Sequence, residues 1–223
     1  MKKKNKMLIT ILMISLILSF GINKSISQVT DIDGNTYKTV KIGTQEWMTE
    51  NLNVEHYRNG DPIPEVKDLK EWERLTTGAW CYYDNDSKNG KTYGKLYNGY
   101  AVNDPLGLEP NGWHIPREAE WTKLSEYFGG KEVAGGKLKA TTLWWSPNAG
   151  ATNESGFTAF PGGATGLDPM FGKVGKYGWF WSCSVNLDKD YDAYCRYLDY
   201  DDPNFFHTYI NKFAGMSCRC IKD

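Results

Sequence analysis

A chain of 223 residues that is 40% hydrophobic and 14% aromatic is long enough to bury the core of one globular domain. Its formal net charge of -1 provides no basic field that would attract a phosphate backbone, so nucleic acid is excluded as a partner. We therefore expect one folded domain whose function depends on local motifs.

Residues 1–27 have the pattern of a secretory signal peptide. A lysine cluster over residues 2–6 precedes an apolar run over residues 7–22 that is too short to span a bilayer comfortably, and small residues follow it. We expect cleavage before Gln28. The remaining domain, residues 28–223, is then exported to the cell surface, the periplasm or the extracellular medium and has no membrane span. An uncleaved membrane anchor is the competing interpretation.

Export determines how the cysteines are interpreted, because thiols form disulfide bonds in oxidising compartments. The odd number of cysteines leaves one thiol free or paired between molecules. No Cys-x-x-Cys spacing occurs, so the sequence does not support a zinc site. The cysteines are Cys81, Cys183, Cys195, Cys218 and Cys220.

The mature chain begins with short strands. Asp33-Gly34 lies between β-prone runs and predicts a hairpin over residues 29–43. Residues 45–48 predict a third strand, and we expect its Trp47 to point into the core.

The next segment is more irregular. Residues 66–75 predict a short helix, and residues 78–83 predict a strand. The acidic stretch over residues 84–90 departs from a calcium-binding EF-hand loop, because Lys95 stands where the bidentate glutamate should be. We interpret it as an Asn/Asp turn.

A helix at the centre of the chain is the strongest local prediction. An extended segment runs into Pro116, which fits the first turn of a helix, and Glu118 and Glu120 follow where the helix dipole favours carboxylates. Apolar residues then recur at i, i+3 and i+7 before Gly129 stops the helix. The predicted core of this region consists of Trp113, Pro116, Trp121, Leu124 and Phe128.

The second half of the chain combines loops with late strands. Residues 133–139 predict a short helical piece that is broken by its glycines. Long loops follow from residue 141. Residues 177–184, 191–198 and 215–223 have the period-two pattern of antiparallel strands.

Several motifs together resemble the Fibrobacter succinogenes major paralogous domain family over nearly the whole mature chain. Residues 115–121 are more remotely similar to the Leu-Pro-Thr-Glu-Ala-Glu-Trp helix of formylglycine-generating enzymes. The fold of those enzymes is related to that of C-type lectins. The resemblance implies an α+β, C-type lectin-like architecture with few helices, twisted antiparallel sheets and long ordered loops. It implies no established activity. The motifs are Gly-Trp-His-Ile-Pro at 112–116, Ala-Glu-Trp at 119–121, Ala-Gly-Gly-Lys-Leu-Lys at 134–139, Asn-Glu-Ser-Gly-Phe at 153–157, Pro-Gly-Gly at 161–163 and Cys-Arg-Cys-Ile at 218–221.

The resemblance also implies a disulfide bond. The family pattern usually has cysteine at the positions of Cys81 and Cys220, which suggests a bridge from an early strand to the last one. With Cys183 and Cys195 on candidate neighbouring strands, we predict a second bridge between them. Cys218 then remains free.

The cysteine pair near the C-terminus raises the question of catalysis, because formylglycine-generating enzymes act through such a pair. Cys218 and Cys220 are one residue apart, a spacing on a strand that is poorly suited to an ordinary disulfide bond. The residues around them do not match the active-site motif of those enzymes. We therefore predict that the chain is not an enzyme.

Calcium is the one metal ion with support in the sequence. The triplet Glu109-Pro110-Asn111 occurs in some C-type lectins that hold calcium and a sugar, but here it precedes the central helix, so we interpret it as a turn. Alternating carboxylates converge on one side of an extended chain, which makes Asp188, Asp190 and Asp192 the candidate ligands. Solvated residues of a hairpin tip are the alternative.

Aromatic pairs in the late loops are candidates for a ligand surface. Flat rings flanked by amide and carboxylate groups suit the C–H faces of sugars or the surface of a protein. We expect at least one member of each pair to pack into the core. The candidate ligand-binding residues are Trp144, Trp145, Phe205, Phe206 and His207.

The sequence therefore predicts an exported, non-catalytic binding module that recognises a polysaccharide or a surface protein and requires no cofactor. Two other classes remain as alternatives: an enzyme related to the formylglycine-generating oxidases, and a structural protein of the cell envelope. The cysteines and the exposed aromatic side chains are the features that distinguish these classes.

Overall fold

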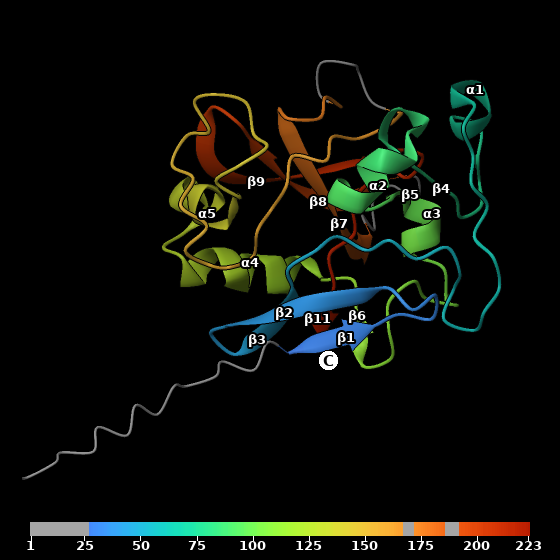
Figure 1. Ribbon diagram of the computed structural model, residues 1–223, viewed down its shortest axis with the longest axis horizontal. Helices are drawn as coiled ribbons and strands as arrows, with labels where there is room; N and C mark the ends of the chain where they lie inside the picture. The colour runs from blue at the N-terminus through green and yellow to red at the C-terminus, as the bar shows by residue number, and fades with distance from the viewer. Residues whose placement is uncertain (1–26, 167–171, 186–191) are drawn as a thin grey trace, which may run out of the picture.

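The computed structural model describes residues 27–166, 172–185 and 192–223. Its described helices are short and its strands form antiparallel sheets, which confirms the α+β class. One sheet lies at the bottom of the view in Figure 1, the C-terminal sheet lies above it beside helices α4 and α5, and the remaining helices surround a small sheet on the other side. Three sheets and two main hydrophobic clusters therefore organise this part of the chain.

The first sheet has the strand order β1-β2-β3-β11-β6. The predicted hairpin and third strand are present, and Trp47 in β3 is fully buried. The Asp31 carboxylate organises the hairpin turn, because it accepts hydrogen bonds from the backbone N–H groups of Asp33 and Asn35. The strands are β1 (Gln28–Thr30), β2 (Thr36–Ile42), β3 (Gln45–Met48), β6 (Trp113–His114) and β11 (Ile221–Lys222).

The second sheet is small and has the order β10-β5-β4. The acidic stretch over residues 84–90, between β4 and β5, was predicted to be a turn. Only its first residues form one, because Asp86 caps helix α2 by accepting a hydrogen bond from the Lys88 N–H. The predicted helix over residues 66–75 is a single turn. The elements are α1 (Leu69–Trp72), β4 (Trp80–Cys81), η1 (Tyr83–Asn85), α2 (Ser87–Tyr93), β5 (Leu96–Asn98), α3 (Gly99–Val102) and β10 (Gly215–Met216).

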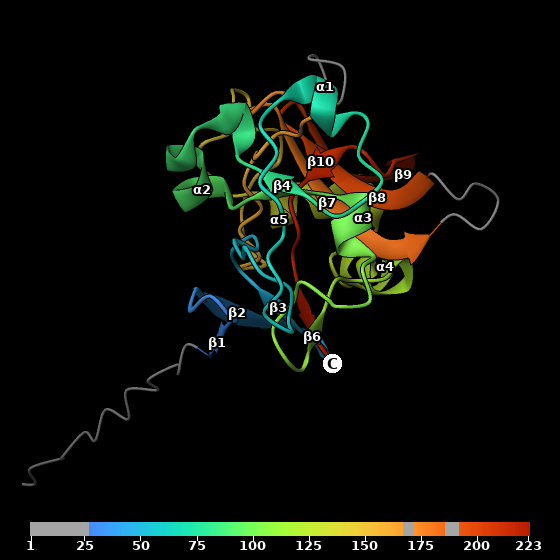
Figure 2. The same ribbon diagram turned by 90° about the vertical axis from the view of Figure 1, so that its right-hand side faces the viewer.

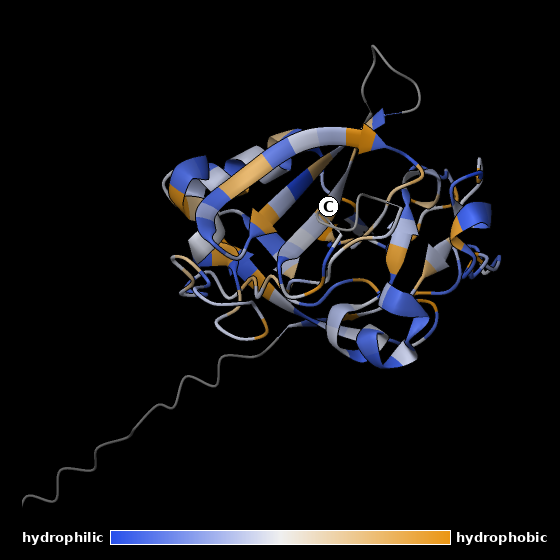
Figure 3. Ribbon diagram, turned by 90° about the horizontal axis from the view of Figure 1, so that it is seen from above, coloured by the Kyte–Doolittle hydropathy of each residue, from blue (hydrophilic) through white to orange (hydrophobic). Residues whose placement is uncertain are grey.

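The third sheet consists of β7 (Tyr177–Val185), β8 (Asp192–Asp199) and β9 (Asp202–Asn211) in that order. Most described residues of β7 and β8 are buried, whereas exposed residues appear at every second position in the middle of β9. Figure 3 shows the ribbon coloured by hydropathy. Strand β9 contradicts the prediction that residues 205–207 lie in a loop. The sequence Asp202-Pro203-Asn204 is typical of a turn. In the structure Asp202 pairs with Asp199 at the end of β8, and these residues begin strand β9.

Helix α4 (Glu118–Tyr127) packs against this third sheet and forms where the sequence predicts it. The Glu120 carboxylate accepts a hydrogen bond from the Arg117 N–H, which satisfies one free donor at the helix start. Trp121 and Leu124 are fully buried, and Phe128, Trp113 and Pro116 are also buried. The apolar stripe of the helix therefore faces the core.

Helix α5 (Lys131–Leu138) packs against strand β9 and lies near it in Figure 1. Figure 2, turned by 90°, places β9 beside β8 and the first sheet below them. It is continuous, contrary to the prediction that its glycines break it. A Cβ atom at Gly135 would collide with the backbone oxygen of Asn204, and one at Gly136 would collide with that of Gly150. The glycines therefore let two other backbone segments approach the helix closely.

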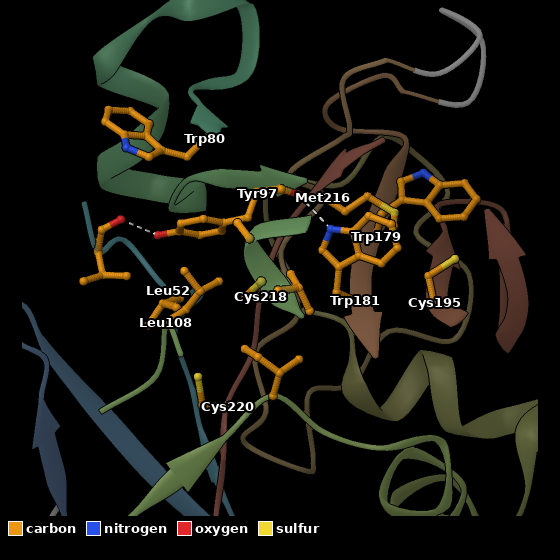
Figure 4. Packing of buried hydrophobic residues seen from close by; sticks show 14 of the residues in the cluster. Leu52, Trp80, Tyr97, Leu108, Trp179, Trp181, Cys195, Met216, Cys218 and Cys220 are labelled. Carbon is orange, nitrogen blue, oxygen red and sulfur yellow. Dashed lines mark hydrogen bonds between the residues drawn. The ribbon is translucent and has the colours of Figure 1, made fainter. Parts of the chain in front are cut away.

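The two main hydrophobic clusters meet along the C-terminal sheet. One cluster lies between the sheets and contains Tyr97 and Trp181, whose indole N–H donates to the Tyr97 carbonyl oxygen at 2.7 Å (Figure 4). The other lies beneath α4 and contains Trp47, Trp121 and Phe205. Successive residues of β7 and β8 point alternately into one cluster and the other.

The C-terminal segment differs from the single strand predicted over residues 215–223. It forms β10, which pairs with β5, and β11, which pairs with β3 and β6. Arg219 lies between the two strands, is fully buried, and donates hydrogen bonds to Asn51 and to backbone oxygens of Met48 and Phe157. The segment thus joins two sheets.

A buried lysine holds the hairpin between β8 and β9. The Lys139 ammonium donates to the backbone oxygens of Asp199 at 2.7 Å and Asp202 at 3.0 Å and lies above the Trp144 ring. Burial lowers the pKa of Lys139 from 10.5 to about 8, although nearby aspartates act in the opposite direction. The ammonium of Lys139 therefore stays charged at neutral pH, and burying this charge lowers the free energy of unfolding.

This pKa predicts a pH-dependent contribution of Lys139 to stability. Between pH 8 and 10.5 the unfolded chain still holds a proton that the folded chain has released, so stability from this group rises with pH. We expect the unfolding free energy of the wild type, minus that of Lys139→Met, to rise by about 1–3 kcal/mol across this window. Urea unfolding at several pH values measures the difference, and a flat or falling difference would contradict the assignment.

None of the helices in the described part of the chain has the length and apolar character that a bilayer crossing requires.

Candidate ligand-binding site

Helix α4, the start of helix α5 and the C-terminal sheet line an open cavity of about 630 Å³, which we call the polar cavity. On the helix, polar residues recur at i, i+4, i+7 and i+8, beside the apolar stripe. Small-molecule sites in proteins have volumes of about 300–1,000 Å³, so the size is that of a binding site. Its lining residues are Glu118, Thr122, Ser125, Glu126, Gly130, Lys131, Ser184, Tyr194, Arg196 and His207.

A buried ion pair forms one wall of the polar cavity. Arg196 in β8 is 4% exposed, and its Nη2 lies 2.7 Å from Glu118 Oε2 and 2.9 Å from the Thr122 hydroxyl. The guanidinium also lies above the Phe205 ring, at 5.6 Å from its centroid. Such a pair is desolvated, so its geometry is held by several partners at once.

Three polar atoms at this wall have no hydrogen-bond partner among the described residues. They are Oε1 of Glu118, Nε of Arg196 and Oγ of Ser125, and all three are shielded from bulk water. An unpartnered buried polar atom costs about 1–3 kcal/mol, so folded proteins rarely retain three of them close together without a reason. The wall of the cavity therefore has unused hydrogen-bonding capacity.

His207 is the predicted ligand-binding residue that lies at the polar cavity. It is exposed in β9, directly opposite Arg196 of β8. Tyr194 lies next along the same face and meets Tyr209 edge to face at 6.4 Å between ring centroids. The rim of the cavity thus combines an imidazole with aromatic rings.

Trp145 is the exposed member of its predicted pair, with 43% of its surface accessible. Tyr200 meets its ring edge to face at 6.0 Å, and Lys173 Nζ lies 4.8 Å from its centroid. A Cβ atom at Gly175 would collide with the Trp145 indole nitrogen, so the glycine makes room for the ring. We call Trp145, Tyr200 and Lys173 the Trp145 platform.

Two of the candidate ligand-binding residues belong to the core, as we expected for one member of each aromatic pair, and are removed from the candidate ligand surface. Trp144 is 9% exposed and donates its indole N–H to the Ala159 carbonyl oxygen at 3.0 Å. Phe205 is 1% exposed, because strand β9 points it at Trp121 of helix α4. One member of each aromatic pair is therefore structural.

Phe206 points to the opposite face of β9 from Phe205. It is half-buried, and its ring stacks on Tyr197 with 4.6 Å between centroids and 10° between planes. Tyr197 in turn stacks on Trp179 at 4.4 Å. One face of the Phe206 ring is thus already in contact with the sheet, and Phe206 points to the opposite face of β9 from His207.

The two predicted disulfide bonds are absent, and all five cysteines are free. Cys81 belongs to the small sheet and packs with Val66 and Trp72, whereas Cys220 belongs to the central cluster. Cys195 pairs in register with Trp181, so Cys183 is displaced from it along the neighbouring strand. Figure 4 shows Cys195 well apart from Cys218 and Cys220, which point into the core.

Burial raises the pKa of these thiols. It raises the pKa of Cys81 to about 12 and that of Cys183 to about 11. The pKa values of Cys218 and Cys220 also lie well above the ordinary value, because both are fully buried. Both members of this pair are therefore in the protonated thiol form at neutral pH, which is less nucleophilic than the thiolate.

The calcium prediction falls mostly outside the described residues, because Asp188 and Asp190 lie there. Asp192 is buried at the start of β8 and pairs in register with Asn211. Within residues 27–166, 172–185 and 192–223, no three histidine, cysteine or carboxylate side chains come together as a metal site. A calcium site formed by the three aspartates stays a prediction.

Sequence reasoning missed the residues that line the polar cavity. A polar stripe at Glu118, Thr122 and Ser125 accompanies the apolar stripe of α4 and was a signal that could have been read. Arg196 gave no such signal, because a single arginine in an alternating strand usually faces solvent. Its burial depends on the helix that covers it.

Comparison with known proteins identifies one family. Residues 40–222 match the family described as Fibrobacter succinogenes major domain. The match extends over most of the chain and includes the central helix and all three sheets. No curated protein and no solved structure matches the chain.

Proposed function

The chain belongs to the Fibrobacter succinogenes major domain family, and from its exposed side chains we propose that it is an exported, non-catalytic module that binds a polysaccharide. The family description names no activity, so the proposal depends on the surface of this chain. The observation that carries it is the exposure of Trp145, which the surrounding residues hold in place instead of burying.

A fixed, exposed indole suits the flat C–H face of a sugar ring. Tyr200 and Gly175 restrict the Trp145 ring, so little side-chain entropy is lost when a ligand stacks on it. Lys173 adds a hydrogen-bond donor at the ring. A polysaccharide offers repeated rings and hydroxyl groups to such a platform, and a surface protein is the other partner that its chemistry allows.

The absence of catalysis is part of the proposal. The cysteine pair suggested a relation to formylglycine-generating oxidases, but burial raises the pKa of both Cys218 and Cys220 well above the ordinary value. Their location in the central cluster supports a packing role. Export to the cell surface rests on the signal-like pattern of residues 1–27, and the C-type lectin-like relation of the fold rests on the motif of residues 115–121.

We expect Trp145→Ala to weaken binding to a retained polysaccharide about two- to tenfold, the range for loss of one aromatic contact. Affinity electrophoresis of the purified chain in gels containing different soluble polysaccharides measures the change. Tyr127→Ala is the matched control, because Tyr127 is 61% exposed and lies on α4, away from the platform.

Two outcomes of this experiment would count against the proposal. If no polysaccharide retards the wild type, the glycan assignment fails; if Trp145→Ala and Tyr127→Ala behave alike, the platform fails. Repeating the measurement with a chelator tests calcium as well, because binding that persists unchanged contradicts a calcium-dependent site.

A further inference from the structure

We propose that the polar cavity is a second binding site, and that it takes one neutral, hydroxyl-rich sugar residue. It shares no lining residue with the Trp145 platform, so the inference goes beyond the proposed function and does not depend on it. The argument rests on the volume of the cavity, the balance of its charges and the unpartnered atoms at its wall.

The charges around the polar cavity cancel. The carboxylates of Glu118 and Glu126 face the cations of Lys131 and Arg196, and one pair among them is in contact at 2.7 Å. A charged ligand would bring a charge that no lining group is left to compensate, which is costly in a partly desolvated site. The cavity therefore favours a ligand without net charge.

The lining residues require a ligand that has both hydrogen-bond donors and hydrogen-bond acceptors. Among the lining groups, the Glu118 carboxylate accepts, the exposed Lys131 ammonium donates and the Thr122 hydroxyl can do either. The unpartnered atoms of Glu118, Arg196 and Ser125 lie in the wall beneath them. Neighbouring hydroxyl groups on a sugar ring provide this combination, because each hydroxyl donates one hydrogen bond and accepts others. Apolar ligands and simple ions do not.

Exposure determines which groups a ligand meets first. Thr122 and His207 are exposed at the opening, and the Glu118 side chain is 22% accessible, whereas that of Arg196 is only 5% accessible. The ligand therefore contacts Thr122, His207 and Glu118, and Arg196 positions the Glu118 carboxylate from behind. Tyr194, half-buried at the rim, offers an aromatic edge to the C–H groups of the ring.

Calorimetric titration of the purified full chain with methyl glycosides of neutral hexoses tests the site, and the matching methyl glycosides of uronic acids serve as charged probes. We expect a neutral glycoside to bind more tightly than its uronic acid counterpart. Thr122→Val removes an exposed hydroxyl with little change in shape and is expected to weaken binding about threefold to tenfold. Thr152→Val, at an exposed residue outside the cavity, is the control.

Glu118→Gln adds a readout that a purely structural role would not change. This substitution leaves the cavity with a net positive charge, so the ratio of uronic acid affinity to neutral glycoside affinity should rise at least severalfold. Glu71→Gln, at an exposed residue of α1 outside the cavity, should leave the ratio unchanged. Thr122→Val removes one contact of Arg196 but keeps its ion pair with Glu118, so this variant keeps the test decisive even if Glu118→Gln fails to fold.

The proposal is overturned if no neutral glycoside binds, if the uronic acids bind more tightly to the wild type, or if Thr122→Val matches Thr152→Val. Trp145→Ala should leave binding of these single-residue glycosides unchanged. Loss of polysaccharide binding with retained glycoside binding would therefore refute only the platform, and the reverse result would refute only the cavity.

Discussion

Replacing Trp121 with alanine is expected to lower the free energy of unfolding by about 3–5 kcal/mol, the range for large aromatic side chains truncated in protein cores. Trp121 is fully buried, and its ring lies 4.8 Å from Trp47 and 5.8 Å from Phe205 between centroids. These partners come from a strand near the N-terminus and a strand near the C-terminus. Because neighbouring rings are rigid, they cannot fill the space that alanine would leave. Urea unfolding followed by fluorescence measures the loss.

Trp145→Ala is the matched control for this substitution. It removes the same number of atoms from a ring that is 43% exposed, so we expect a loss below about 1 kcal/mol. Equal losses for the two tryptophans would contradict the packing of α4 against the C-terminal sheet. A small loss for both would mean that the core beneath α4 is not where the structure has it.

Replacing Arg219 with methionine is expected to lower the free energy of unfolding by about 3 kcal/mol, although methionine has a similar length and is apolar. The Arg219 guanidinium donates to Asn51 Oδ1 at 2.8 Å, to the Met48 oxygen at 3.0 Å and to the Phe157 oxygen at 2.6 Å. All of these acceptors are buried and would lose a donor. Each unpartnered acceptor costs about 1–3 kcal/mol, less the gain from no longer burying a charge.

The fully buried guanidinium stays charged at neutral pH. Burial lowers the pKa of Arg219 from 12.5 to about 9, which is still above physiological pH. Its Cζ also lies 4.3 Å from the centroid of the Phe157 ring, a cation–π contact that Arg219→Lys would weaken. Arg74→Met, at an exposed arginine after helix α1, is the control and should change stability by less than about 0.5 kcal/mol. If Arg219→Met is as stable as Arg74→Met, Arg219 does not join the two sheets as described.

The central helix could be predicted because its signals are local. Pro116, the early glutamates and the spacing of Trp121 and Leu124 all lie within about three turns of helix, and each indicates the same boundaries. The first hairpin was predictable for the same reason, since Asp33-Gly34 and the residues beside it determine the turn. The family resemblance also came from motifs that are continuous in the sequence.

Strand β9 and the C-terminal segment could not be predicted in this way. Asp202, Pro203 and Asn204 favour a turn, and only pairing with β8 makes the segment from Asp202 to Asn211 a strand. Gly215–Met216 and Ile221–Lys222 are too short to define strands by pattern, and their partners lie far away in the sequence. The disulfide prediction failed for a related reason: Cys81 and Cys220 belong to different hydrophobic clusters, and Cys183 is displaced from Cys195 along the neighbouring strand.

The sequence by itself determined the α+β class, the position of the central helix, the residues that form its buried stripe and the family of the chain. These depend on periodicity, caps and motifs that act between near neighbours. Only the tertiary structure decided which member of each aromatic pair is exposed and that Arg196 is buried beside Glu118. It also decided that a polar cavity lies between α4 and strands β8 and β9. Burial is a property of what covers a residue, and here the covering elements are distant in the chain.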